Sequence, residues 1–181
     1  NITEPPALTS STAGTPATCN GVCDGSGTVT AGGGTPVLTY AWDGGAGFQT
    51  TATATGLCDG TFNVTVTDGN GCSATNTTTI TEPQAMGLTT TSTNVTCYNA
   101  CDGTASASIS GGVAPYTYLW NDPALQQTPN ANNLCAGSYT VTVTDGNGCI
   151  QTSSVNITQP QILDIIVTSV TPSTCGNANG G

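Results

Sequence analysis

The cysteines are the side chains of this 181-residue chain best suited to form covalent bonds or to bind a metal ion. There are nine, and the first four are Cys19 and Cys23 in a C-x3-C pair, then Cys58 and Cys72 in a C-x13-C pair. Structural zinc sites are typically built from closely spaced pairs separated by matching intervals, and this pattern does not fit them. Disulfide bonds formed in an oxidising compartment fit it better. The cysteines therefore indicate an extracellular protein.

The ionisable side chains exclude most other chemistry. Lys, Arg and His are absent, and ten Asp and Glu residues give a formal net charge of −10. A chain without basic residues cannot neutralise phosphates, so we expect no nucleic-acid partner. A chain without His has no imidazole for a catalytic triad or a metal site. No apolar run approaches 18 residues, so we expect no membrane insertion. The sequence thus predicts a protein that is not an enzyme and has no catalytic residues.

Three carboxylates remain as candidate metal ligands. Asp24, Asp59 and Asp102 each follow a cysteine and precede a glycine. Carboxylates gathered by a disulfide could bind Ca²⁺, which prefers oxygen ligands. Asp-Gly is also favourable turn chemistry, and Ala136 replaces the fourth member of the set. We prefer the turn interpretation and predict no metal and no cofactor.

A tandem repeat positions all these residues. The motif ITEP at 2–5 recurs at 80–83 and, as ITQP, at 157–160. The first cysteine pair and Trp42 recur 78 residues later, and VTVTDGNGC recurs letter for letter 77 residues later, ending at Cys149. Units of this length suit small independent domains. We predict the end of one repeat at 1–4, complete repeats at 5–82 and 83–159, and the truncated start of a third at 160–181, so that the chain is a piece of a longer secreted protein.

The pattern within each unit is all-β. Thr and Val alternate before the DGNG turns, and further glycine-rich turns follow at short intervals. About seven short strands in such a unit predict immunoglobulin-like β-sandwiches, arranged head to tail. A Trp two residues after a Tyr, and the motif Leu-x-x-Gly-x-aromatic, are typical of the core of such a sandwich. The predicted core residues are Trp42, Trp120, Leu57, Leu134, Phe62 and Tyr139.

The combined motifs resemble the SprB repeat. They are TCNGVCDGSGTVTAGGGTP, LTYAW, GLCDGTFNVTVTDGNGC and TITEP in the first unit, with CYNACDGTASASISGGVAPYTYLW and NLCAGSYTVTVTDGNGC in the second. That family occurs in long cell-surface adhesins of gliding Bacteroidetes, which the type IX system secretes. The resemblance implies a bacterial cell-surface location, a role in cell adhesion and gliding motility, and no catalytic residues.

The sandwich geometry limits the disulfide pairing without fixing it. Cys23 and Cys58 precede strands that begin at one end of the sandwich, so we predict Cys23–Cys58 and, likewise, Cys101–Cys135. A disulfide needs Cα atoms within about 7 Å. Cys72 lies at the far end of a strand of seven or eight residues, roughly 25 Å from Cys58. Cys19 is only four residues from Cys23, so an in-domain bond between Cys19 and Cys72 would be strained. We therefore favour a cross-domain Cys19–Cys149 pair. The in-domain alternative is Cys19–Cys72 with Cys97–Cys149. In the favoured scheme Cys72, Cys97 and Cys175 have partners outside this chain segment.

Two functional hypotheses follow. The first is a non-enzymatic stalk segment of a filamentous adhesin, whose partners are neighbouring repeats and, beyond them, surface polysaccharide or other adhesin threads. The alternative is a lectin-like module that contacts polysaccharide directly, for which Phe48, Tyr98 and Tyr116 could form a stacking patch. The apolar segment 162–167 is interpreted as the first strand of a third domain, with a donor strand inserted into a neighbour as the alternative.

Overall fold

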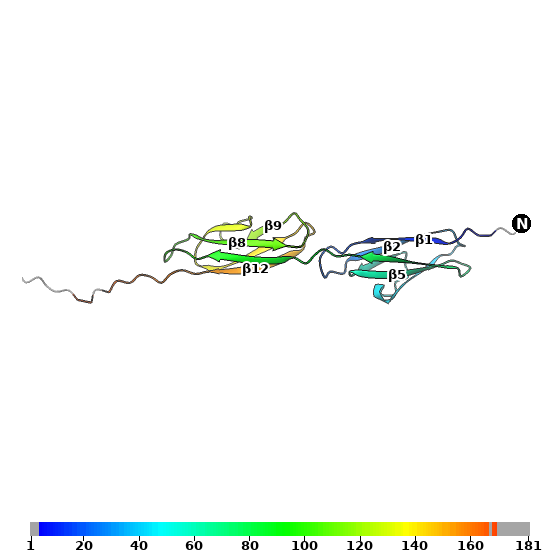
Figure 1. The fold of residues 1–181 in the computed structure, drawn as a ribbon, viewed down its shortest axis with the longest axis horizontal. Helices are drawn as coiled ribbons and strands as arrows, with labels where there is room; N and C mark the ends of the chain where they lie inside the picture. Colours follow the sequence, from blue (N-terminus) through cyan, green and yellow to red (C-terminus); the bar gives the residue numbers. More distant parts are fainter. Residues whose placement is uncertain (1–3, 167, 170–181) are drawn as a thin grey trace, which may run out of the picture.

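The structure, a computed structural model, describes residues 4–166, 168 and 169, and these form two β-sandwiches that lie one after the other along the long axis (Figure 1). We call β1–β6 the first unit and β7–β12 the second unit. The strands are β1 (Thr9–Thr15), β2 (Gly25–Gly32), β3 (Thr39–Trp42), β4 (Thr53–Leu57), β5 (Gly60–Thr67), β6 (Ser73–Ile80), β7 (Gly87–Thr93), β8 (Gly103–Ser110), β9 (Thr117–Trp120), β10 (Asn130–Leu134), β11 (Gly137–Thr144) and β12 (Ile150–Ile157). The one helical element of the described segment is a 3₁₀ turn, η1 (Gly44–Ala46), and nothing in that segment is a helix able to cross a membrane.

Each unit has two three-stranded antiparallel sheets. The strand orders are β1-β2-β4 and β3-β5-β6 in the first unit, and β7-β8-β10 and β9-β11-β12 in the second. These orders match strands A-B-E and C-F-G of the immunoglobulin sandwich, which confirms the all-β, immunoglobulin-like prediction.

The number of strands differs from the prediction, with six in each unit where about seven were expected. The position of strand D is taken in the first unit by η1 and the loop that follows it. Asp43 caps η1 by accepting a hydrogen bond from the Ala46 N–H, and the Phe48 N–H donates to the Asp43 carbonyl. The chain therefore turns back at once and leaves no extended segment to form another edge strand.

Both cores are centred on the predicted tryptophans. Trp42 and Trp120 are buried, and their indole N–H groups donate to the carbonyls of Thr51 at 2.9 Å and Thr128 at 3.1 Å. The structure also buries Leu57, Leu134 and Phe62. Tyr139 is only half-buried, because its hydroxyl reaches out to donate to the carbonyl of Cys135.

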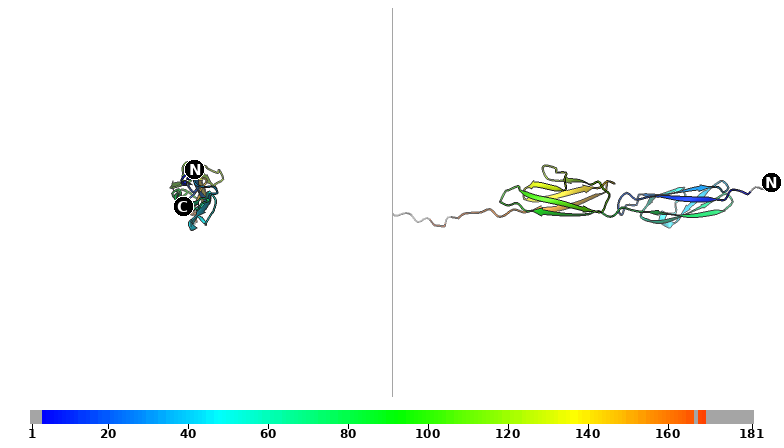
Figure 2. Two further views of the ribbon diagram at one scale, coloured as in Figure 1. Left: turned by 90° about the vertical axis from the view of Figure 1, so that its right-hand side faces the viewer. Right: turned by 45° about the horizontal axis from the view of Figure 1, so that its top comes forward.

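One pair of neighbouring strands closes each sandwich along its side. The Thr12 hydroxyl donates to the Thr77 carbonyl, and the Asn76 amide donates to the Ser10 carbonyl, so β1 and β6 run side by side in the same direction. In the second unit the hydroxyls of Thr90 on β7 and Ser153 on β12 lie 2.9 Å apart. The right-hand view of Figure 2 shows the two units one after the other, with their strands running along the long axis.

The residues after β12 form no strand as far as the structure describes them. Ile162, Leu163, Ile165 and Ile166 are exposed. Val167 and Cys175, which belong to the predicted third repeat, lie outside the described residues. The segment therefore shows neither of the two arrangements considered for it.

Candidate functional site

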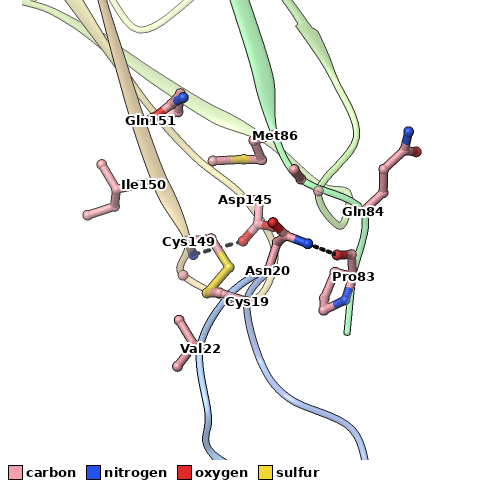
Figure 3. A pocket seen from close by; sticks show the side chains of 13 residues that line it. Cys19, Asn20, Val22, Pro83, Gln84, Met86, Asp145, Cys149, Ile150 and Gln151 are labelled. Atoms are coloured by element: carbon pink, nitrogen blue, oxygen red, sulfur yellow. Dashed lines mark hydrogen bonds between the residues drawn. A yellow bond between two sulfur atoms is a disulfide. The ribbon is translucent and has the colours of Figure 1, made fainter. Parts of the chain in front are cut away.

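The site that the sequence points to is the joint between the units, where a disulfide bond joins Cys19 to Cys149. Their Cα atoms lie 5.8 Å apart, and 130 residues separate them in sequence. Two further bonds lie within units, Cys23–Cys58 in the first and Cys101–Cys135 in the second. Cys72 and Cys97 are unpaired and exposed, so the alternative in-domain pairs are not present. Figure 3 shows the cross-domain bond beside the segment that links the units.

Asp145 positions Cys149. Its carboxylate accepts hydrogen bonds from the N–H groups of Val113, Asn147 and Cys149, each at 2.9 Å. The side chain is buried, which raises its pKa, but these bonds to the charged form outweigh that effect and hold the pKa below its ordinary value. These three hydrogen bonds to the aspartate, which we call the aspartate brace, fix the DGNG turn and the cysteine at its end.

The same brace exists at the outer end of the first unit. Asp68 accepts hydrogen bonds from the N–H groups of Thr35, Asn70 and Cys72. The bond from Thr35 is the largest of the effects that lower the pKa of Asp68. Cys72 is therefore held as Cys149 is, although it has no partner.

Asp24 fixes the other side of the disulfide. Its carboxylate accepts from both the N–H and the hydroxyl of Thr18, the residue before Cys19, and the hydroxyl bond is the first cause of its lowered pKa. In the second unit Asp102 accepts from Thr96 in the same way, and its pKa is lowered for the same reason. These two aspartates brace the cysteine loops and are more than the turn residues that the sequence predicted.

The segment between the units, 81–86, is held along most of its length. The Thr81 carbonyl accepts from Ala17, the Pro83 carbonyl accepts from Asn20, and the Gln84 carbonyl accepts from Gly112 at 2.8 Å. Glu82 accepts from the Asn20 amide and from the Gly21 N–H at 2.7 Å. The link between the units is therefore docked against both of them.

Gly111 permits this docking, and Gly33 is its counterpart at the outer end of the first unit. Gly111 has a φ of 67°, and a Cβ there would lie 2.0 Å from the Ala85 carbonyl oxygen. Gly33 in the first unit has a φ of 70°, and its Cβ would lie 2.1 Å from the Ala7 carbonyl oxygen. Any other residue at either position would both strain the backbone and push the preceding segment away.

Polar and apolar contacts complete the joint. The Asn147 amide donates to the Thr18 carbonyl at 2.8 Å, across the boundary between the units. Beside the disulfide lies a cavity of about 520 Å³, around which the side chains of Val22, Met86 and Ile150 are arranged (Figure 3). The cavity is open and its walls come from both units.

The remaining predicted residues are not brought together. The structure places no cluster of three or more Asp, Glu or Cys side chains suited to a metal ion among the residues it describes, and Asp24 and Asp102 are already engaged by threonines. Phe48 is in the first unit, whereas Tyr98 follows β7 and Tyr116 precedes β9, at opposite ends of the second unit. The three aromatic side chains that the lectin-like alternative would bring together therefore lie apart from one another.

Sequence reasoning missed Glu82 and Asn147. The ITEP and DGNG motifs that contain them were visible as repeat markers, and their recurrence was the one available signal. What the motifs did not reveal is that these side chains bond to backbone groups 61 and 129 residues away.

Comparison with known proteins gives a match to one family. The model described as the SprB repeat matches residues 11–47 and 89–125. A search of curated proteins finds no match.

One similar solved structure carries the description "Structural basis for Dscam isoform specificity". It has 12% identity and a TM-score of 0.34, over 84% of this chain and 47% of that one. Another is an amphioxus IgVJ-C2 molecule, with 14% identity and a TM-score of 0.32, over 69% of this chain and 90% of that one. This chain spans about half the length of the first of these structures. The immunoglobulin-like assignment rests on the strand order within each unit.

The family match falls on the same part of both units, from the first strand to just beyond the buried tryptophan. The predicted resemblance is confirmed, because the SprB repeat model matches once in each unit.

Proposed function

We propose that this chain is a structural stalk segment of a bacterial cell-surface adhesin, with neighbouring repeats of the same chain as its partners. The SprB repeats support an adhesin-type repeat at the cell surface. The gliding, type IX secretion and filament roles that the family resemblance implies belong to the same proposal. One observation carries it: the joint has two covalent connections, the segment 81–86 and the Cys19–Cys149 bond.

The carboxylates support a structural role in place of a catalytic one. Asp68, Asp122 and Asp145 are the buried acidic side chains of the described segment, and each accepts several hydrogen bonds. Their pKa values lie below the ordinary range, so they stay ionised at neutral pH and do not act as general acids. We propose that the chain is not an enzyme.

The outer ends carry the same groups as the joint. At one end the Gly34 N–H donates to the Pro6 carbonyl, as Gly112 does to Gln84. At the other the Val95 N–H donates to the Thr158 carbonyl, and the Asn99 N–H donates to Gln159, in the place of Glu82. We propose that units add head to tail by repeating one joint, so that Cys72 pairs with the preceding unit and Cys97 with a following one.

Small-angle scattering on the oxidised chain tests the stalk. We expect a maximum dimension of at least two sandwich lengths and little flexing, whereas two sandwiches packed side by side would contradict the proposal.

Non-reducing peptide mapping of a chain lengthened by one preceding repeat tests the pairing. We expect Cys72 linked to the counterpart of Cys19 in that repeat. A free Cys72 in the lengthened chain would contradict repeated use of the joint.

A further inference from the structure

The Cys19–Cys149 bond offers a short covalent route through both units. From the N-terminal side the route runs along β1 to Cys19, crosses the sulfur–sulfur bond, and continues from Cys149 directly into β12. Both strands lie at the edge of a sheet, and each pairs with one strand only, β1 with β2 and β12 with β11. The rest of both units lies off this route.

The length of this route differs greatly from that of the main chain. Between residues 5 and 159 the route contains about 25 residues, which extend to roughly 90 Å. The main chain between the same points extends to roughly 540 Å. The difference arises because Cys19 and Cys149 are 130 positions apart in sequence, and the residues between them, which include both tryptophan cores and both in-domain disulfides, lie off the route.

We infer that this bond makes the chain a nearly inextensible tether, in which pulling force passes along β1 and β12 and bypasses both sandwich cores. The inference rests on the proposed stalk function and adds a mechanical property to it. Force could peel an edge strand from its neighbour. It could not lengthen the molecule by unfolding the domains, since the excluded residues are closed into a covalent loop.

The peptide segment 81–86, which is the second connection between the units, gives a second route for the pulling force. The main chain itself runs from β6 through 81–86 into β7, beside β1 and β12 respectively. If Cys72 and Cys97 pair as proposed, this route also becomes continuous from unit to unit. Each sandwich would then be crossed by two covalent lines, on adjacent parallel strands.

Single-molecule stretching of the full oxidised chain, held at its two ends, tests the inference. The wild-type chain should give no unfolding step that releases domain length. In C19S/C149S, the in-domain bonds still close 35 and 34 residues, which leaves about 61 of the excluded residues to extend. We expect contour-length gains totalling roughly 210 Å. Reducing that variant should release roughly 240 Å more.

The matched control is C101S/C135S, which removes a bond that lies inside the closed loop. Because Cys19–Cys149 remains, this variant should gain no contour length, whether or not its second unit is fully folded.

Domain-sized steps in a wild-type chain whose Cys19–Cys149 bond is verified by peptide mapping would overturn the inference, as would finding that the oxidised chain lacks this bond. Neither result would be the same as a failure of the stalk proposal. An extended rod in scattering that nevertheless lengthens under force would refute the tether and leave the stalk, whereas a compact pair of units would refute the stalk.

Discussion

The two DGNG ends of this molecule have nearly the same sequence and different surroundings. At the joint, Cys149 is bonded to Cys19 and the Asn147 amide donates to Thr18 of the other unit. At the outer end of the first unit, Cys72 is unpaired and the equivalent amide, that of Asn70, donates to the hydroxyl of Thr35 in its own unit. The aspartate brace is the same at both ends.

The outer end of the first unit therefore has its hydrogen-bonded structure without a docked partner. The carboxylate of Asp68 holds Cys72 without any neighbour, so docking costs little ordering of the backbone at this site. If this end docks as proposed, we expect a local change, in which the Asn70 amide turns from Thr35 to the neighbouring unit and Cys72 is oxidised together with its partner cysteine. A string of such units can therefore be built by adding a repeat without refolding its predecessor.

The largest expected effect is on the free energy of unfolding, and it distinguishes Cys149, which is bonded to Cys19, from Cys72, which is unpaired. C19S/C149S removes a closure of 130 residues, and the chain-entropy model gives a loss of about 5 kcal/mol in the free energy of unfolding both units. The matched variant Cys72→Ser should change it by less than about 0.5 kcal/mol. Guanidinium unfolding of the oxidised proteins measures both. Equal losses would mean that the two ends are not different in solution.

The next prediction concerns the cores behind the two ends. Trp42→Ala and Trp120→Ala should each cost about 3–5 kcal/mol, because each removes a fully enclosed side chain. Denaturation followed by circular dichroism measures these losses, with Leu119→Ala, at a site that is 45% exposed, as control. A loss below about 1 kcal/mol at either tryptophan would show that the unit concerned is not packed as described.

Acid should destabilise the DGNG turns of both units. The folded pKa values of Asp68 and Asp145 lie below the ordinary value of 3.8. Their contribution to stability is therefore complete above that pH and is lost as the pH falls through the lower, folded values. Thermal unfolding should show a falling midpoint below a pH of about 4, and Asp68→Asn with Asp145→Asn should flatten the profile. A midpoint that rises on acidification would contradict the brace.

The smallest effect distinguishes the two amides. Asn147→Ala and Asn70→Ala each remove one hydrogen bond, worth about 0.5–1.5 kcal/mol. Only Asn147→Ala should broaden the distance distribution between fluorophores placed on the two units, because only that bond crosses the joint. Broadening in Asn70→Ala as well would indicate that the ends communicate through the first unit.

The sandwich was predictable because local sequence determines most of it. Alternating Thr and Val in β5 and β11 place one face in the core, and Asp-Gly turns at fixed intervals set the strand lengths. Cys23 and Cys58 were predictable as a pair because both precede strands that start at the same end. The missing strand D was not, since it depends on the Asp43 cap folding the loop back.

The joint was only partly predictable. Its cysteines were visible because a strand of known length keeps Cys72 away from Cys19. The role of Glu82 was not, because it depends on the Gly21 N–H and the Asn20 side-chain amide, which come near it only after the unit has folded. Asp24 was assigned to a turn for the same reason: its partner Thr18 lies six residues earlier, across a loop that the sequence does not describe.

The Cys19–Cys149 bond also changes what damage to the backbone can do. Every peptide bond between those two residues lies inside a closed covalent ring of both units. A single cut by a protease in any loop from residue 20 to 148 opens the ring but leaves the two ends of the molecule joined through sulfur. The exposed loops, which are the places most open to cleavage, are thereby the places where one cut does not sever the chain.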